Sequence, residues 1–326
     1  MPTVVLSQSP PHRLWTVAQL LGVGLTVVLI LGLVRWPIPT LHLLWDMVIP
    51  VLPAVFLVNP MLWRNVCPLG TLNDWTGRRG QAPLSLGLLV GAWIVGVVLL
   101  GTLVPARRFL FNQDGLALAV TIVVVGVLAL VVGFRSPRRA GFCNSLCPVL
   151  PVEKLYGQAP LVKVASARCR TCDLCTRAGC IDLVGGKGAR QSLRRRGQQW
   201  LLSPFGIFAA AFPGFIIGYF TRENGTIATA GSVYLHVGTW ALGSLLLVTL
   251  LMHLVRPQVA VALPLLGGLS AGLYYWYAAP GLATAYGIGT SGAAVVRALA
   301  AVLLAVWLWN AFRTRQQEPA FPAVTG

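Results

Sequence analysis

Seven cysteines are the residues of this sequence best suited to chemistry, and all lie in two of its polar segments. They are Cys67, Cys143, Cys147, Cys169, Cys172, Cys175 and Cys180. None falls in a long apolar run, although cysteine is often buried in apolar surroundings. The sequence predicts a membrane protein, and the distribution of its basic residues, described below, places both segments on the cytoplasmic side, where thiols stay reduced. This grouping therefore favours metal ligands over disulfides.

The strongest single motif is Cys169-Arg-Thr-Cys172-Asp-Leu-Cys175. Cysteines at successive three-residue steps wrap a tight turn, so that three thiolates converge on one iron–sulfur cubane. Bacterial ferredoxins use the run Cys-x2-Cys-x2-Cys-x3-Cys-Pro. Here the next cysteine, Cys180, comes one residue later and no proline follows it. The competing interpretation is a structural zinc site, but such sites prefer paired Cys-x2-Cys knuckles well separated in sequence, so the motif favours iron–sulfur.

Two Cys-Pro dipeptides, at 67–68 and 147–148, each follow a hydrophobic segment. Seven thiolates cannot complete two cubanes that each need four. In one scheme Cys147 joins the triple run, which leaves Cys67, Cys143 and Cys180 for a second cluster. In another, the second cluster takes Cys67, Cys143, Cys147 and Cys180, and the first has a fourth ligand other than cysteine. A third scheme has a single cluster, so the residues predict one or two [4Fe–4S] clusters.

The elements that must position these cysteines are membrane helices. Of 326 residues, 56% are hydrophobic and only 10% are charged, against about 25% charged in soluble domains. Most of the apolar runs reach the ~20 residues that a helix needs to cross ~30 Å of hydrocarbon. The runs are Leu14–Val34, Leu41–Val58, Leu84–Val104, Leu116–Phe134, Trp200–Phe220, Val233–Val255, Val259–Tyr277 and Ala293–Phe312. The second contains Pro50 and Pro53, which predict a kink or a re-entrant segment.

The net charge of +17 follows the loops rather than a nucleic-acid surface. With the cysteine segments inside, 20 of the 25 Lys and Arg lie inside, four lie outside and Arg297 lies within the last span. This is the positive-inside rule, and it predicts a multi-pass protein of the bacterial inner membrane with both termini cytoplasmic. The basic run at 190–196 is placed to contact anionic lipid headgroups. We expect membrane lipids and no nucleic acid as partners.

The sequence predicts an all-α integral membrane protein with about eight transmembrane helices and a small ferredoxin-like insert. We expect membrane regions at 1–134 and 200–313, a Cys-Pro loop at 60–83, the iron–sulfur insert at 135–199 and a tail at 314–326. The insert has few large apolar residues, and so small a core usually needs metal or disulfides to fold.

His42 and Asp46 are spaced i,i+4 in the second span and should share one helix face. An imidazole beside a carboxylate can accept the protons of a quinol, so the pair is a candidate catalytic site for quinol oxidation. Arg297 is the expected partner that neutralises Asp46, and the simpler interpretation is that those two residues only pair. His236 and His253 lie about 25 Å apart along one helix and about 100° apart around it. That geometry does not suit two stacked haems, so haem b is not expected.

The Cys-Pro motifs at the exits of membrane helices, followed by a ferredoxin-like run, resemble the NapH/NosR/CcoG group of polyferredoxin membrane proteins. The resemblance covers roughly 60–185. It implies an oxidoreductase subunit that passes electrons between quinone or quinol, cytoplasmic clusters and other redox subunits or an extracytoplasmic reductase. Three features depart from the family pattern: Trp63 replaces the first cysteine of Cys-x3-Cys-Pro, only one ferredoxin run is present, and the spacing to Cys180 is longer.

Two other classes of protein remain open. One is an assembly factor that handles copper or thiols during maturation of an extracytoplasmic metalloenzyme. The other is a structural membrane subunit stabilised by zinc.

Overall fold

The computed structural model describes residues 12–77, 86–135, 141–162, 164, 197–289 and 291–315. Regular structure in these ranges is helical, with no strand. Eight of the described helical stretches are long and apolar enough to cross a membrane, and each predicted apolar run overlaps one of them. The all-α, multi-pass prediction is therefore confirmed. Of the predicted insert, only 135, 141–162, 164 and 197–199 are described, so its ferredoxin-like part lies outside the described residues.

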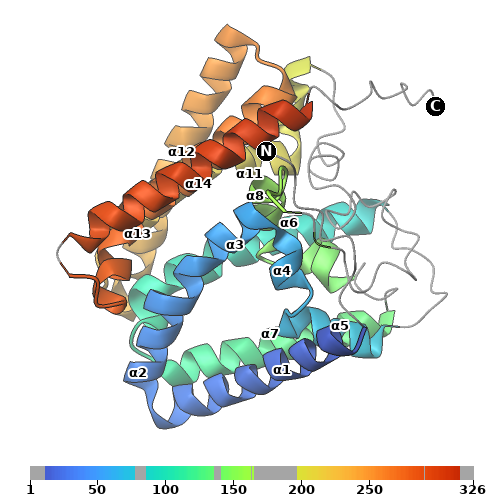
Figure 1. Cartoon of the computed structure of the whole chain (residues 1–326), viewed down its shortest axis with the longest axis vertical. Coiled ribbons are helices and arrows are strands. Elements are labelled where there is room, and N and C mark those ends of the chain that lie inside the picture. Colours follow the sequence, from blue (N-terminus) through green and yellow to red (C-terminus); the bar gives the residue numbers. More distant parts are fainter. Residues whose placement is uncertain are drawn as a thin grey trace.

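The N-terminal half supplies four of these stretches and the short helices that follow the second and fourth. In chain order its elements are α1 (His12–Arg35), α2 (Pro37–His42), η1 (Leu43–Val48), η2 (Ile49–Val51), α3 (Leu52–Val58), α4 (Pro60–Arg64), α5 (Pro68–Thr76), α6 (Leu86–Ala106), η3 (Arg107–Phe111), α7 (Gly115–Arg135), η5 (Phe142–Leu146) and α8 (Leu150–Tyr156). Figure 1 shows α1 and α7 side by side, with the short helices gathered near one end of the spans.

The second span is a broken helix, as its prolines predict. It passes from α2 through one turn of π-helix, η1, and one of 3-10 helix, η2, into α3. Proline has no N–H to donate and its ring crowds the preceding turn, so a regular ladder cannot continue through Pro50 and Pro53. The hydroxyl of Tyr275 enters the gap: it accepts from the N–H of Ala54 at 2.8 Å and donates to the carbonyl of Pro50 at 3.1 Å. A side chain of another span thus completes this ladder.

The C-terminal half packs around one central helix. Its elements are η7 (Gly197–Leu202), α11 (Pro204–Thr221), η8 (Ile227–Thr229), α12 (Ala230–Val255), α13 (Val259–Ala285) and α14 (Gly292–Arg315). A larger share of α11 is buried than of any other described span. Phe205, Phe208 and Phe212 lie on one of its faces and pack ring against ring. This aromatic row belongs to the main core, which also contains Trp93 of α6.

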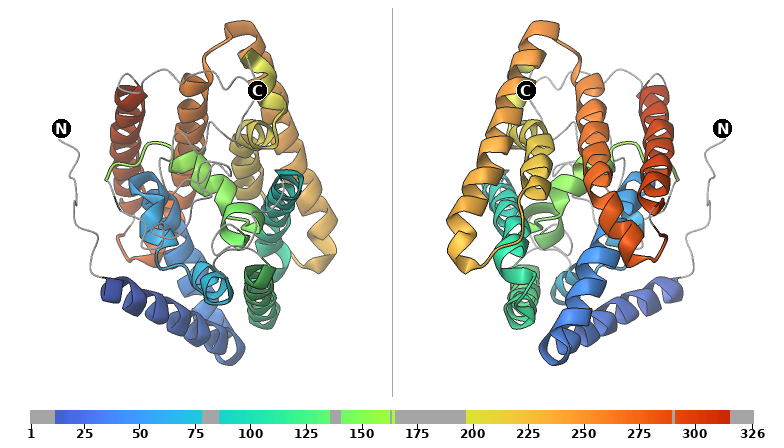
Figure 2. Two further views of the ribbon diagram at one scale, coloured as in Figure 1. Left: turned by 90° about the vertical axis from the view of Figure 1, so that its right-hand side faces the viewer. Right: turned by 90° about the vertical axis from the view of Figure 1, so that its left-hand side faces the viewer.

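The outer helices keep apolar side chains exposed, which is the arrangement expected of a surface that faces lipid. Little of α1 and α12 is buried, and Figure 2 shows α1 at the edge of the bundle. Leu25, Leu31 and Leu235 are each more than half exposed. Contact with the hydrocarbon of a bilayer would cover these side chains.

The bundle has two chemically different ends. The first, which we call the cysteine end, carries α4, α5, η5 and α8. The other, which we call the distal end, carries η1, η3 and the turn before η8. They are opposite because α3 and α6 run from one to the other, and Figure 1 shows α4, α5 and α8 on one side and α2 and the turn between α13 and α14 on the other.

Candidate functional site

The two Cys-Pro dipeptides at the cysteine end have nearly the same backbone conformation. Cys67 has φ −54° and ψ 124°, and Cys147 has φ −60° and ψ 120°. Each amide donates back into the preceding helical turn, from Cys67 to the carbonyl of Trp63 at 2.8 Å and from Cys147 to that of Phe142 at 3.0 Å. Pro68 then opens α5, since its fixed φ suits the first turn of a helix. After Cys147, by contrast, Pro148 and Val149 form a turn, and α8 begins at Leu150. The similarity between the two sequences is therefore a similarity of structure at the cysteines themselves.

The two turns, which are far apart in sequence, pack against each other at Gly70. A β-carbon on Gly70 would lie 3.4 Å from Sγ of Cys143 and 3.8 Å from Cβ of Cys67. Behind the second turn, a β-carbon on Gly96 of α6 would meet the carbonyl oxygens of residues 145–147 at 3.1–3.2 Å. A β-carbon on Gly70 would make ordinary contacts with the two cysteines, whereas one on Gly96 would be too close to the carbonyls of the second turn. Glycine at 96 is therefore what allows α6 to approach this turn so closely.

Cys147 is the most enclosed of the three described thiols. Burial raises its pKa well above the ordinary value, and the charges of Glu153, Cys143 and Cys67 raise it further. The influence of Cys143 and Cys67 shows that the three thiols share one neighbourhood. A metal that bound this thiol would displace its proton.

These thiols fit an iron–sulfur cluster only in part. Among the described residues, no group of three His, Cys, Asp or Glu side chains is placed to hold a metal ion. The triple run at 169–175 and Cys180 lie outside the described residues. The described part of the cysteine end therefore offers soft sulfur donors from two converging turns, but not a complete ligand set.

A buried ion pair lies beside the thiols. Nη1 of Arg64 donates to Oε2 of Glu153 at 2.7 Å, with the two side chains only 4% and 3% exposed. Nη2 of Arg64 donates to Oδ1 of Asn144 at 2.9 Å. The pair joins α4, which leads to Cys67, to η5 and to α8, which lie on either side of Cys147.

The helix α8 is buried along its length, including its charged residues Glu153 and Lys154. The chain after it is fixed by both halves of the bundle: the N–H of Leu161 donates to the carbonyl of Val58, and the side chain of Asn310 donates to the carbonyls at 159 and 160. The second Cys-Pro turn is thus held in the interior rather than on a loose loop.

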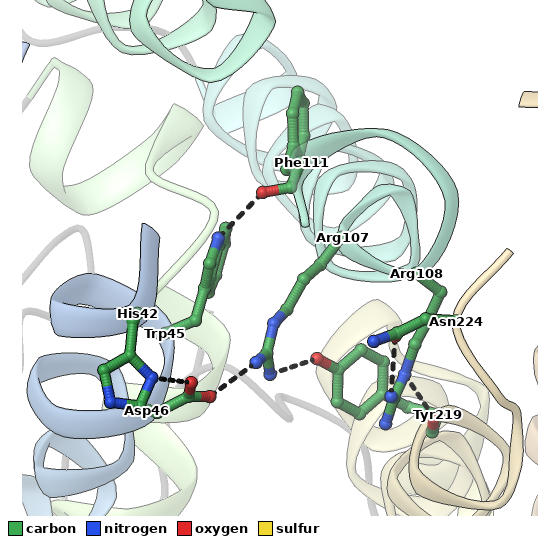
Figure 3. Close-up of polar contacts among 8 residues, drawn as sticks. All are labelled: His42, Trp45, Asp46, Arg107, Arg108, Phe111, Tyr219 and Asn224. Atoms are coloured by element: carbon green, nitrogen blue, oxygen red, sulfur yellow. Dashed lines mark hydrogen bonds and ion pairs between the residues drawn. The ribbon is translucent and has the colours of Figure 1, made fainter. Parts of the chain in front are cut away.

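A second polar cluster, the distal network, joins three spans at the distal end. His42 Nδ1 and Oδ2 of Asp46 lie 2.7 Å apart, which suits an N–H donating to the carboxylate. Arg107 donates to Oδ1 of Asp46 at 2.9 Å and to the hydroxyl of Tyr219 at 3.0 Å. Figure 3 shows this chain of contacts, with Trp45 beside it donating to the carbonyl of Phe111.

The prediction that Arg297 pairs with Asp46 was wrong. Arg297 instead donates to the carbonyl of Trp276, with its guanidinium 4.3 Å from the centre of that ring. Arg107 takes the place beside Asp46, because α6 ends in the π-turn η3 that begins at this residue. The sequence signal was an adjacent pair of arginines at the end of an apolar run, which we had assigned to an outer loop.

Neighbouring contacts fix the rest of the distal end. Arg108 donates to the carbonyl of Tyr219 and to the side chain of Asn224, both at 3.0 Å. His236 lies 3.0 Å from the hydroxyl of Thr221, whereas His253 is exposed at the other end of α12. The two histidines therefore do not face one common site.

The structure brings together Cys67, Cys143 and Cys147 at one end, and His42 and Asp46 at the other. From Asp46 to Val58 alone, the helix rises about 18 Å. Sequence reasoning identified these five residues but missed Arg64, Asn144 and Glu153, and it missed Arg107 and Tyr219 as partners of Asp46. In comparisons with known proteins, no family model, curated protein or solved structure matches the chain.

Proposed function

We propose that this chain is a multi-pass iron–sulfur protein that transfers electrons between the quinone pool and a redox partner. In this proposal it is an oxidoreductase subunit in the bacterial inner membrane, related to the polyferredoxin proteins that its motifs resemble. The cysteine end faces the cytoplasm, and the partner is another redox subunit or an extracytoplasmic reductase.

One observation carries the proposal: the cysteines of the two Cys-Pro turns have nearly the same φ and ψ, and the two turns converge at Gly70. Sγ of Cys143 and Cβ of Cys67 both lie close to Gly70, at the end of the bundle where the chain continues into the triple cysteine run. Thiols recruited from separate segments are typical of iron–sulfur ligation, in which the distal cysteine comes from elsewhere in the chain. A [4Fe–4S] cluster, when bound, supplies one-electron chemistry at this end.

The distal network suits a proton acceptor. Both oxygens of Asp46 are engaged, one by His42 and one by Arg107. The carboxylate therefore orients the imidazole and leaves Nε2 of His42 as the nitrogen able to take a proton. The side chain of His42 is 55% exposed. A quinol releases two protons with its two electrons. We propose that each proton passes in turn to this nitrogen and then to water. The two electrons would leave one at a time, through a bound [4Fe–4S] cluster, to the redox partner.

Metal analysis tests the proposal directly. Protein purified without oxygen should contain about four or eight irons per chain with matching acid-labile sulfide. Dithionite should produce the low-temperature paramagnetic resonance of a reduced [4Fe–4S] centre, and Cys172→Ser should abolish or strongly alter it. Cys67→Ser should spare the signal if one cluster exists and remove about half of the iron if there are two. Stoichiometric zinc without iron or sulfide would reject the redox assignment.

A second candidate function is an assembly factor that handles copper or thiols. The position of Cys143 and Cys67 on the same glycine, Gly70, favours it, since two thiols suffice to bind a soft cuprous ion or to exchange disulfides. The two functions differ in their need for quinol. Cluster reduction by a quinol analogue supports electron transfer, whereas copper binding without quinol oxidation supports the assembly factor.

A further inference from the structure

Arg64 occupies a central place between the two Cys-Pro turns. It lies in α4, three residues before Cys67, and its guanidinium reaches across to the other turn. One of its amino groups contacts Asn144, the residue directly after Cys143, and the other contacts Glu153 of α8. One side chain thus connects the segments before, between and after the described cysteines.

A buried ion pair is a poor device for stability alone. Removing two charges from water costs more than their attraction returns unless the geometry is excellent, and well-packed apolar residues often stabilise as much or more. A planar guanidinium does, however, fix direction, because its parallel N–H groups hold two acceptors at set positions. The contacts of Arg64 with Glu153 and Asn144 have this form.

We infer that Arg64 is a positioning residue that holds Cys67 and Cys143 at the separation their shared site requires. Asn144 is the direct link, since it moves with Cys143. Glu153 holds the other side of the guanidinium and keeps its charge compensated in the interior. The geometric claim applies to any ligand that the two thiols share, and its effect on a cluster rests on the proposed function.

Disulfide formation measures the positioning without any metal. We would use the full chain with only Cys67 and Cys143 retained, and the other five cysteines changed to serine. Added diamide should oxidise the two thiols within one chain, and the rate reports how closely they are held. Arg64→Gln should slow this reaction about tenfold or more, because a misplacement of about 1 Å between reacting groups can cost about 10²-fold in rate. Arg64→Lys keeps the positive charge but not the planar guanidinium. Its rate of disulfide formation should lie between that of the protein with native Arg64 and that of Arg64→Gln.

The matched control is Arg135→Gln, which removes an exposed arginine at the C-terminus of α7. It should leave the rate unchanged. Because Arg64→Gln alone could prevent folding, Arg64→Met/Glu153→Leu removes both charges and retains an apolar interior. This double variant should fold and still oxidise slowly. Oxidation as fast as in Arg135→Gln, in either the single or the double variant, would overturn the inference.

The potential of the bound cluster supplies a second, independent measurement. The positive charge of Arg64 favours the reduced cluster, which carries one more negative charge, and Glu153 opposes it. Arg64→Gln should therefore shift the midpoint potential downward and Glu153→Gln should shift it upward. A purely structural role does not predict shifts of opposite sign in the two variants. Midpoint potentials that shift in the same direction would therefore contradict the inference. Wild-type protein without iron would reject the proposed function, while the disulfide rates would still decide the positioning.

Discussion

The two ends of the bundle use the same kind of contact in opposite surroundings. At each, an arginine bridges a carboxylate to a neutral group: Arg64 joins Glu153 to Asn144, and Arg107 joins Asp46 to Tyr219. Arg64 and Glu153 are 4% and 3% exposed, whereas Arg107 and Asp46 are 22% and 35% exposed. Burial, not chemical type, is what separates these two clusters.

That difference teaches what each cluster can do. The buried pair is almost closed to solvent, so we expect it to act by fixing its neighbours and by its field. The exposed network can exchange protons, since the imidazole that completes it faces outward. The first should therefore matter mainly for stability and thiol geometry, and the second for reaction rate.

The largest expected effect comes from breaking the buried pair. Glu153→Gln leaves the guanidinium of Arg64 buried without its counter-charge, which should lower the free energy of unfolding by about 3–5 kcal/mol. Thermal unfolding in detergent measures the change. The matched variant at the other end, Arg107→Gln, should cost below about 1 kcal/mol because its pair is partly exposed. Equal losses of unfolding free energy in the two variants would show that burial does not distinguish the two clusters.

A smaller loss of stability should follow from Tyr275→Phe. Its hydroxyl is buried and serves both Ala54 and Pro50 in the broken second span. Without it, two backbone groups lose their shared partner, and we expect a loss of about 1–3 kcal/mol in total. Tyr286→Phe is the control, since that half-exposed hydroxyl donates only to the carbonyl of Met47. If both variants unfold at the wild-type temperature, Tyr275 does not support the second span.

Asp46→Asn should change rate rather than stability. The amide cannot hold the imidazole and Arg107 as the carboxylate does, so quinol-driven reduction should slow by about 10²-fold or more, as for other losses of general acid–base catalysis. Reduction by dithionite and the iron content should stay the same. Arg297→Gln is the control, because Arg297 contacts Trp276 and not Asp46. An unchanged quinol rate in Asp46→Asn would leave the distal network a structural role only.

The spans could be predicted because their signal is local. The length and hydrophobicity of each apolar run can be read from the run itself. The prolines of the second span likewise indicate where its helical hydrogen bonds are interrupted. The i,i+4 pair of His42 and Asp46 was likewise contained in one helix. Their contact, at 2.7 Å, needed only the periodicity of that helix.

The partners across the bundle could not be predicted, because they depend on packing between distant segments. Arg64 and Glu153 are charged residues in short polar stretches, where an exposed position is the ordinary expectation. Only the burial of α8 makes them a pair. Arg107 and Arg297 were equally suitable partners for Asp46 by charge, but the sequence placed Arg107 in an outer loop and Arg297 within a span. In the structure Arg107 begins the π-turn η3 and contacts Asp46.

The smallest expected effect is an absence of labelling of the native cysteines from outside the cell. This experiment tests which end of the bundle faces the cytoplasm. The positive-inside count puts the cysteine end inside, so a membrane-impermeant maleimide applied to intact cells should label none of the seven cysteines. Glu223→Cys places a thiol on the exposed turn before η8, at the distal end, and should be labelled under the same conditions. Permeabilised cells serve as the positive control for the native thiols that are not buried.

Labelling of Cys67 or Cys180 from outside would reverse the orientation, and the buried ion pair would then support an extracytoplasmic site. Labelling of Glu223→Cys alone places proton release at the distal end on the outer side of the membrane and the thiols on the inner side.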